Sequence, residues 1–281
     1  MSTPPTDPAP PAPGPPLPEP PLPEPPSPEL PTPERDFGSD EAILAEAEPG
    51  LPPWEGQAPA VPVLHLDAHL VAVSKPPGLL VHRIEDSPEK VVLLQAVRDQ
   101  IGAYLFPVHR LDRPASGVIV FGLSRPAAAA LQKALPREET RKEYLVLARG
   151  ECPDAFESRR PLRSQRGQPQ EAWTEFQTLA RGRGCSLLRA RLHTGRYHQI
   201  RRHLAHLAHQ VLGDTSYGKG RLNALYREQY GLSRLFLHAA RLLIAHPAGE
   251  GTLDLRAPLA DDLRQVLLKV GGFDPDMVAT L

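Results

Sequence analysis

From about residue 61 onward, the hydrophobic and polar positions of the chain fall into short alternating runs. Residues 61–67, VPVLHLD, alternate as a strand does, and residues 70–82, LVAVSKPPGLLVH, predict a strand, a tight Pro-Gly turn and a second strand. Residues 117–124, GVIVFGLS, form an apolar run that is typical of a buried strand. The pattern therefore predicts that this part of the chain is rich in β-structure.

A helical period interrupts the strands in three places. Residues 90–101, KVVLLQAVRDQI, have helical spacing, and residues 124–135, SRPAAAALQKAL, predict a helix with Ser124 as N-cap and proline in its first turn. Residues 196–214 also change to a period of about 3.6 residues. The apolar positions on one face of this third helix are Ile200, Leu204, Leu207 and Val211.

Further strands are expected later in the chain, before a final helix at residues 260–271, ADDLRQVLLKVG. These strands cover residues 141–150, 173–182, 185–195, 236–247 and 251–259. Strands and helices do not alternate regularly, so the fold class is predicted to be α+β, with a mixed, mostly antiparallel sheet. The sequence contains no internal repeat.

The first 60 residues differ sharply in composition from the rest. They hold 21 of the 35 prolines, and they carry eleven Asp or Glu residues against one Arg. Such a segment cannot bury enough apolar surface to offset the entropy of ordering it. We expect residues 1–60 to be a disordered acidic tail, either inert or docking a partner through its proline-rich stretch, and residues 61–281 to be one catalytic domain.

The formal net charge of -1 hides this segregation of charge. With a net charge of about -10 in the first 60 residues, the remainder carries about +9, mostly as arginine. A basic domain favours an anionic partner such as nucleic acid, and the arginine fork suits phosphate. A genome rich in arginine codons would explain the same composition.

Two cysteines, Cys152 and Cys185, form no CxxC motif and indicate a reducing compartment. The amino terminus has no basic start followed by an apolar core, and no apolar run reaches 18 residues. The expected location is therefore the cytoplasm, with no membrane partner. Nucleotide-binding motifs such as GxxxxGK[ST] and GxGxxG are absent from the sequence, so no cofactor is expected.

The stretch FPVHRLDRPASGVIVFG places one carboxylate, Asp112, between Arg110 and Arg113 at the start of a strand. In an extended loop, residues 110 and 112 point the same way and residue 113 points the other way. Small residues follow, which leaves room for a ligand to approach closely. Two interpretations stay open at this point, a ligand site around Asp112 or an Asp–Arg pair that caps a loop.

Three other features carry candidate chemistry. Tyr144 lies two residues after Lys142 on a predicted strand, where a half-buried core tyrosine is the usual interpretation. Gly195 ends a strand just before a helix, whose first amides form an anion site. The arginines near this helix start are Arg196, Arg201 and Arg202. Four histidines follow between residues 198 and 209, but their spacing drifts round the helix and no Cys or Glu completes a set, so no metal site is predicted.

Several of these stretches together resemble the RluA family of RNA pseudouridine synthases. The matching motifs, in chain order, are KPPGLLVH (75–82), HRLDRPASG (109–117), KEYLVLARG (142–150), TGRYHQIRRH (194–203) and LLIAHP (242–247). The resemblance spans residues 61–272. It implies the pseudouridine synthase fold, with flanking helices and an active-site cleft, and an isomerase that converts uridine in RNA to pseudouridine without cofactor or metal.

The resemblance also implies roles for individual residues. Asp112 is expected to be the essential catalytic carboxylate, kept ionised by Arg201, and Tyr144 to stack on the flipped uracil and mediate removal of the C5 proton. A carboxylate beside C1′ suits a sugar with oxocarbenium character, and the target base must leave its stack. Arg110 is expected to fill the gap left by the flipped base, and Ile200 to contact the base. Arg113, Arg196 and Arg202 are expected to bind RNA.

Within the family, the segment after Leu212 most resembles the TruC type, which acts on tRNA at the T-stem uridine conventionally numbered 65. Residues 217–234 interleave basic and aromatic residues, which suits RNA, and Lys219, Arg221 and Arg227 are the predicted contacts. A surface helix whose tyrosines pack inward is the alternative for this segment. Alternatives for the whole protein are an enzyme acting on ribosomal RNA, an RNA-binding protein without catalysis, and a metal-dependent hydrolase that uses the histidines between residues 198 and 209. The protein is expected to be a monomer.

Overall fold

The computed structural model describes residues 58–82, 91–164 and 166–281. The predicted acidic, proline-rich tail therefore lies outside the described residues, except for residues 58–60. Within the described ranges, none of the helices is long and apolar enough to cross a membrane.

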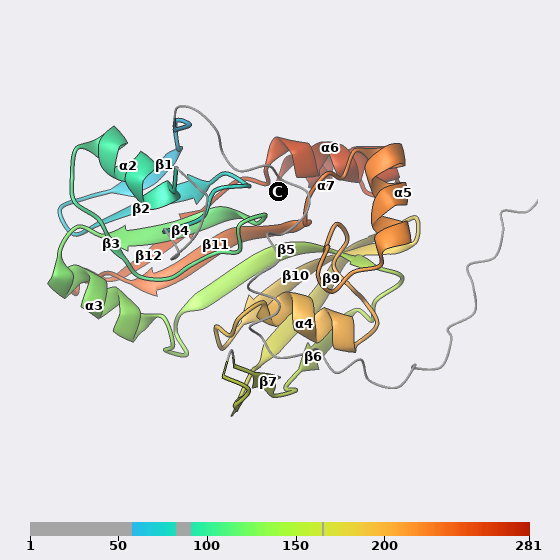
Figure 1. Cartoon of the computed structure of the whole chain (residues 1–281), viewed down its shortest axis with the longest axis horizontal. Coiled ribbons are helices and arrows are strands. Elements are labelled where there is room, and N and C mark those ends of the chain that lie inside the picture. The colour runs from blue at the N-terminus through green and yellow to red at the C-terminus, as the bar shows by residue number, and fades with distance from the viewer. Residues whose placement is uncertain (1–57, 83–90, 165) are drawn as a thin grey trace, which may run out of the picture. The chain divides into compact units, whose positions relative to one another are not determined.

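One large sheet organises the described residues (Figure 1). Its ten strands follow the order β1-β2-β4-β11-β5-β10-β9-β6, with β3 paired to β4 and β12 to β11. The strands are β1 (Val63–Leu66), β2 (Leu70–Lys75), β3 (Phe106–Pro107), β4 (Ser116–Gly122), β5 (Arg141–Arg149), β6 (Ala155–Ser158), β9 (Thr174–Gly182), β10 (Cys185–Leu192), β11 (Leu237–Ala245) and β12 (Thr252–Arg256). All pairs are antiparallel except β4 with β11, so the predicted mixed, mostly antiparallel sheet is confirmed.

Six helices and a small hairpin complete the described part. The helices are α2 (Leu93–Ile101), α3 (Arg125–Ala134), α4 (Gln199–His206), α5 (Gly220–Tyr230), α6 (Asp261–Val270) and α7 (Pro275–Ala279), and the hairpin pairs β7 (Leu162–Arg163) with β8 (Pro169–Gln170). The N-cap predicted for α3 is confirmed, because Oγ of Ser124 accepts a hydrogen bond from the Ala127 amide at 3.3 Å.

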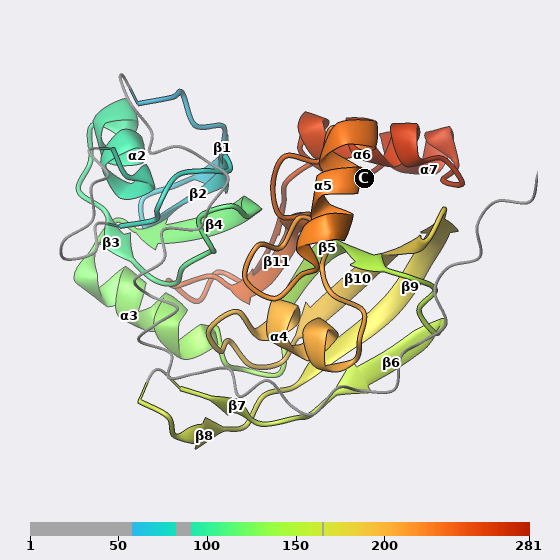
Figure 2. The same ribbon diagram turned by 45° about the vertical axis from the view of Figure 1, so that its right-hand side comes forward.

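Alternation along two strands shows which helices share a face of the sheet. On β4, Ile119 and Phe121 pack with α2, whereas Val118 and Val120 pack on the opposite side with residues of α3. On β5, even-numbered residues from Tyr144 onward pack with α4, and the odd-numbered ones pack with α5 and α6. Tyr144 contacts both the α2 core and the α4 core. The α2 and α4 cores therefore meet at β5 on one face, as Figure 2 lets the reader follow.

Two sequence predictions of local structure are wrong. Residues 79–82 form no second strand, because Leu79 and Val81 reach the core from an irregular segment that follows the turn at Gly78. The helix predicted for residues 196–214 is restricted to α4, where Ala208 adopts a positive φ of 61° just after the helix. After the end of α4, Val211 pairs with Ala148 of β5. The short strands β6, β7 and β8 were not predicted from the sequence.

Candidate active site

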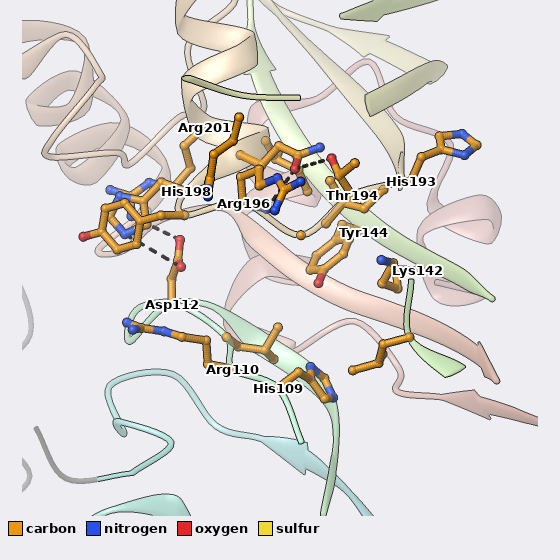
Figure 3. Close-up of a pocket in the computed structure, with 18 of the residues that line it drawn as sticks. His109, Arg110, Asp112, Lys142, Tyr144, His193, Thr194, Arg196, His198 and Arg201 are labelled. Carbon is orange, nitrogen blue, oxygen red and sulfur yellow. Dashed lines mark hydrogen bonds and ion pairs between the residues drawn. The ribbon is translucent and has the colours of Figure 1, made fainter. Parts of the chain in front are cut away.

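A cleft of about 1020 Å³ opens on the face shared by α2 and α4. Its walls come from the loop between β3 and β4, from β5, from the β7–β8 hairpin and from the segment that leads into α4. Asp112 stands on one wall, with Tyr144 on β5 and Arg201 on α4 nearby (Figure 3). The three residues predicted to be catalytic are therefore brought into one cleft, although they lie far apart in the sequence.

The backbone of the Asp112 loop is held from below by a buried lysine. Lys75 is fully buried at the end of β2, and its Nζ donates hydrogen bonds to the carbonyls of Pro76 (2.9 Å), Arg113 (3.0 Å) and Ala115 (2.7 Å). Such a charged donor satisfies carbonyl groups that a tight loop cannot pair within itself. Lys75 thereby fixes two residues that follow Asp112 in the turn, Arg113 and Ala115.

The next residues of this loop leave no room for larger side chains. Gly117 has a φ of 110°, and a Cβ atom there would lie 2.2 Å from the carbonyl oxygen of Ala239 on β11. Only glycine combines that backbone conformation with so close an approach. Arg234, which is buried, donates from Nη1 to the carbonyl of Pro114 at 3.2 Å and from Nη2 to Oγ of Ser116 at 3.2 Å. Hydrogen bonds from Arg234 therefore hold this loop in addition to those from Lys75.

Arg201 connects α4 to the Asp112 loop. Its side chain is 1% exposed, and it forms two bonds with Asp214, from Nε at 2.8 Å and from Nη2 at 2.9 Å. The remaining Nη1 donates to Oδ2 of Asp112 at 3.2 Å. Bidentate pairing fixes the plane of a guanidinium, so Asp214 orients the Nη1 group of Arg201 toward Asp112.

The electrostatic surroundings keep Asp112 ionised. Burial alone would raise the pKa of this carboxyl, but the nearby His198, Arg201 and Arg110 side chains and the hydrogen bond from Arg201 outweigh burial and lower it. Burial holds the pKa of His198 at about 4, so the His198 ring is neutral at pH 7. The Arg201 guanidinium is therefore the principal support of the Asp112 charge at neutral pH.

His198 is held in an uncommon backbone conformation beside Asp112. Its φ is 50°, in the left-handed region, at the residue that precedes α4. The ring lies 3.7 Å from Oδ1 of Asp112 through Nε2, and Nδ1 lies 3.2 Å from the hydroxyl of Tyr217. The Tyr197 ring stacks on the His198 ring, with 3.7 Å between the ring centroids. Strain of this kind persists where surrounding contacts determine the conformation, as they do here.

Tyr144 and several apolar side chains form the surface that faces Asp112. Burial and the nearby charge of Asp112 raise the pKa of Tyr144, so its hydroxyl stays protonated at neutral pH. Ile200, which is 3% exposed, lines the cleft with Leu192 and Leu237. A flat aromatic ring with aliphatic neighbours matches the shape of a single planar base.

The predicted RNA-binding arginines near the cleft have different surroundings. Arg110 is exposed at the cleft, with its guanidinium carbon 5.9 Å from the centre of the Tyr197 ring. Arg196 lines the cleft and donates from Nε to the carbonyl of Glu171 at 2.8 Å. Arg113 donates from Nε to the carbonyl of Gly78 at 3.0 Å and is not among the residues that line the cleft.

Arg202, also a predicted RNA contact, points into the protein. Its side chain is buried and donates to the carbonyl of Arg163 at 2.9 Å. The next residue, His203, is fully buried and contacts the carbonyl of Arg160 through Nε2 at 3.0 Å. Both side chains thus join α4 to the segment that carries the β7–β8 hairpin, and a direct contact of Arg202 with RNA stays a prediction.

The basic segment after Asp214 is divided between surface and core. Lys219, Arg221 and Arg227 are exposed at and along α5, away from the residues that line the cleft. Tyr226 is buried, and Tyr230 packs against the same core. The tyrosines therefore pack inward as in the alternative interpretation, whereas the side chains of Lys219, Arg221 and Arg227 face outward.

The described residues contain no group of three or more His, Cys, Asp or Glu side chains that could hold a metal ion.

Four residues that shape the site, Lys75, His198, Asp214 and Arg234, were not predicted from the sequence. Lys75 and His198 lie inside the quoted motifs, and LGD ends in Asp214, so position in a motif was an available signal. Arg234 had no such signal, because its contacts join segments about 120 residues apart.

Comparisons with known proteins identify the family of this chain. Residues 69–206 match the family model described as RNA pseudouridylate synthase. The chain is 38% identical over 240 residues to tRNA pseudouridine synthase C of Vibrio cholerae, covering 77% of this chain and 98% of the relative. It is 40% identical over 239 residues to tRNA pseudouridine synthase C of Salmonella typhi, covering 76% and 92%.

Solved structures show the same fold. Human RNA Pseudouridylate Synthase Domain Containing 4 is 25% identical, with a TM-score of 0.62 over 74% of this chain and 92% of the human one. Human RNA Pseudouridylate Synthase Domain Containing 1, at 22% identity, has a TM-score of 0.60 over 73% and 86%. The chain belongs to the RNA pseudouridylate synthase family, and it is an isomerase that converts uridine in RNA to pseudouridine.

Proposed function

We propose that this enzyme isomerises a uridine in the T-stem of tRNA, the position conventionally numbered 65. The relatives named tRNA pseudouridine synthase C support tRNA as the substrate. The observation that carries the catalytic part is the carboxylate of Asp112, aimed and charge-stabilised by Arg201, which Asp214 fixes in turn. A cleft in which the Tyr144 ring faces that carboxylate fits one nucleotide flipped out of its stack.

In this proposal Asp112 acts at C1′ of the ribose. The bond between C1′ and N1 breaks, its electron pair leaves with the uracil, and the ionised carboxylate reacts with or stabilises the electron-poor sugar. The uracil then turns, and C5 forms the new bond to C1′. The net change is an isomerisation, so it needs no oxidant, reductant or energy source.

Tyr144 is assigned two roles, stacking on the uracil and moving the proton from C5. Its hydroxyl is protonated at neutral pH because its pKa is raised, so it cannot act as a free phenolate. It can accept the C5 proton only while its own proton passes to another acceptor, for which the nearby carboxylate of Asp112 is suited. Ile200 contacts the base from α4.

RNA contacts are assigned to the cations around the site. Arg110, exposed beside Tyr197, fills the gap left by the flipped base, and Arg196 binds backbone at the cleft edge. The exposed cations of α5, Lys219, Arg221 and Arg227, bind phosphates further away. We assign Arg113 and Arg202 to the RNA interface through the loops they hold, since both donate to backbone carbonyls.

The rest of the proposal concerns the whole chain. Residues 61–281 act as one catalytic domain and as a monomer in the cytoplasm, with no cofactor or metal. The disordered tail proposed for residues 1–60 takes no part in catalysis.

The test is a product assay with purified full-length protein. Unmodified tRNA transcripts should gain pseudouridine in the T-stem, and short single strands of the same sequence should not react. Ribosomal RNA fragments form the comparison arm, and Asp112→Asn protein is the inactive control. If ribosomal fragments react while every tRNA is inert, the tRNA assignment is wrong and the synthase assignment stands.

A second measurement locates the RNA contacts on α5. Neutralising Lys219, Arg221 and Arg227 together should weaken tRNA binding and reduce the slope of log K against log salt by up to about three phosphate contacts. The single-turnover rate at saturating RNA should stay near that of the wild type. An unchanged salt slope would remove this face from the proposed interface.

A further inference from the structure

Lys142 shares the cleft with the catalytic residues but has no part in the scheme above. It lies two residues before Tyr144 on β5, so both side chains project from the same face of the strand. Both line the cleft, and Figure 3 shows the Tyr144 ring between Asp112 and Lys142 in that view. The cleft therefore has an anion on one side of the aromatic surface and a cation on the other.

The fold itself makes little use of this cation. Among the described residues, no hydrogen bond or ion pair joins Nζ of Lys142 to another group. The neighbouring Glu143 points to the opposite face of β5, where it pairs with Arg241 at 3.6 Å. His109 also lines the cleft, and burial and the Lys142 charge lower its pKa to about 4, so its ring is neutral at pH 7 and cannot balance the ammonium.

A half-buried ammonium that has no partner within the described part of the chain is costly, and burial accordingly lowers the pKa of Lys142. A strand facing a hydrophobic core would be more stable with an apolar residue at this position. The position of the charge in the cleft, beside Tyr144, indicates that its partner arrives with the substrate. An ammonium has three donors and no acceptor, so the partner must supply an oxygen or a negative charge.

The geometry of a bound uridine identifies that partner. With C1′ at Asp112 and the base stacked on Tyr144, the uracil extends from Asp112 across the tyrosine ring toward Lys142. The edge of the base away from the sugar carries a carbonyl oxygen. Neutral uracil carries no full charge there, but the detached base does, because the electron pair of the broken C1′–N1 bond is delocalised over N1 and the carbonyl oxygens.

We propose that Lys142 is a catalytic residue that donates a hydrogen bond to a carbonyl oxygen of the target uracil and stabilises the negative charge of the detached base. This inference rests on the proposed function of the Asp112 site. The ammonium keeps its protons throughout, and the electron pair stays on the uracil until C5 attacks C1′. A fixed cation beside developing charge is an effective form of transition-state stabilisation.

The first test compares Lys142→Met, which keeps length and packing, with Lys142→Arg, which keeps the charge. In single turnover with saturating tRNA, K142M should slow pseudouridine formation about 10²–10³-fold and change the RNA Kd less than about threefold. K142R should recover at least about a tenth of the wild-type rate. Lys133→Met, the same change at an exposed lysine of α3 outside the cleft, is the matched control and should behave as wild type.

A second substrate separates charge stabilisation from a structural role. Fluorine at C5 withdraws electrons and stabilises the uracil anion without help from the enzyme. With 5-fluorouridine at the target position, K142M should therefore lose less rate in glycosidic-bond cleavage than it loses with uridine. An equal loss with both substrates would overturn the proposal, and so would a K142R protein that melts like wild type but is as slow as K142M.

Two further outcomes would also refute a role for Lys142 at the base. A normal single-turnover rate with weaker binding and a shallower salt dependence would make Lys142 a phosphate contact. Equal rates for K142M and wild type would leave Lys142 without any part in the reaction. Because wild-type turnover is measured beside the variants, absence of wild-type product on tRNA would instead show that the tRNA assignment is wrong.

Discussion

Two buried arginines hold the same loop in different ways. Arg201 pairs with Asp214, and Arg234 pairs with Asp262 from Nε at 2.6 Å and Nη2 at 2.9 Å. Each guanidinium is thus fixed by a carboxylate. Arg201 uses its remaining edge on the Asp112 carboxylate, whereas Arg234 uses its own on the Pro114 carbonyl and Ser116.

The partners of the two arginines also differ in exposure. The Asp214 side chain is 0% exposed and that of Asp262 is 49% exposed. A buried pair is strongly destabilised when one member is removed, because the other is left charged and out of water. The pair that supports charge in the cleft is therefore the one that tolerates least change, and the pair that supports backbone can be relieved by water.

Removing the group that Arg201 supports should have the largest effect. Asp112→Asn keeps volume and hydrogen-bonding capacity but loses the charge that acts at C1′. We expect turnover to fall by about 10⁴-fold or more, with tRNA affinity little changed because affinity comes mainly from phosphate contacts. Single-turnover assays and a binding titration measure the two quantities, and appreciable residual turnover would remove Asp112 from its assigned role.

Arg201→Met should have the next largest effect, and it should shift the pH profile. Burial raises the pKa of Asp112, and Arg201 is the principal charge that opposes burial at neutral pH. Wild-type activity needs the ionised carboxylate, so it should persist until the pH falls below a lowered pKa. In the variant the acid limb of kcat should move to higher pH, with a rate loss of about 10³-fold at pH 7.

The same variant leaves Asp214 buried without its cation, which should cost about 3–5 kcal/mol of unfolding free energy. Arg201→Lys is the matched control, because it keeps a charge but cannot form the two-edged bridge between Asp214 and Asp112. Denaturant unfolding reports stability and the kcat profile reports the pKa. An acid limb at the same pH in wild type and R201M would show that other groups keep Asp112 ionised.

Asp214→Asn tests whether the orientation of the Arg201 side chain matters apart from its charge. Oδ1 of Asp214 also accepts from the amides of Ser216 (2.9 Å) and Tyr217 (3.0 Å), so the variant loses the charge but keeps an acceptor for the turn. Arg201 should then be less well fixed, and kcat should fall about 10- to 100-fold with KM little changed. A fall in affinity with normal kcat would assign Asp214 to RNA binding instead.

The contrast between local and long-range contacts also explains what the sequence predicted. Strands β2, β4, β5, β9 and β10 and helix α3 follow from local alternation or capping, and each lies close to its predicted position. The end of α4 was placed too late, because Leu204, Leu207 and Val211 keep an apolar period although Val211 pairs with a strand. Periodicity cannot distinguish a helix from an irregular segment that buries the same residues.

The same difference between local patterns and long-range contacts decides which site residues could be predicted. Asp112, Tyr144 and Arg201 were predicted because each lies in a motif of the family. Arg202 lies in the same motif and points inward, because the neighbouring positions of a short helix face different sides. The pairing of Arg234 with the Asp112 loop depends on β4 and β11 lying parallel and adjacent, which no local pattern encodes.

Arg234→Met should lower kcat less than Arg201→Met does, and it should have the smallest effect of these variants. It removes two hydrogen bonds to the loop, so we expect about a tenfold lower kcat and a loss of about 1–3 kcal/mol of stability.

The stability effect of this variant should also depend on pH. Burial alone would raise the pKa of Asp262, but Arg234 outweighs burial, so this carboxyl has a lowered pKa in the folded protein. A lowered pKa stabilises the fold above the ordinary value of 3.8 and loses that contribution as the pH falls through the folded value. The stability difference between wild type and R234M should therefore shrink as the pH is lowered below about 4.

Asp262→Asn is the matched control, and it should lower kcat less than R234M does because Arg234 keeps its bonds to Pro114 and Ser116. If R234M and R201M lower kcat equally, the loop backbone matters as much as the charge, and the distinction between the two pairs is wrong.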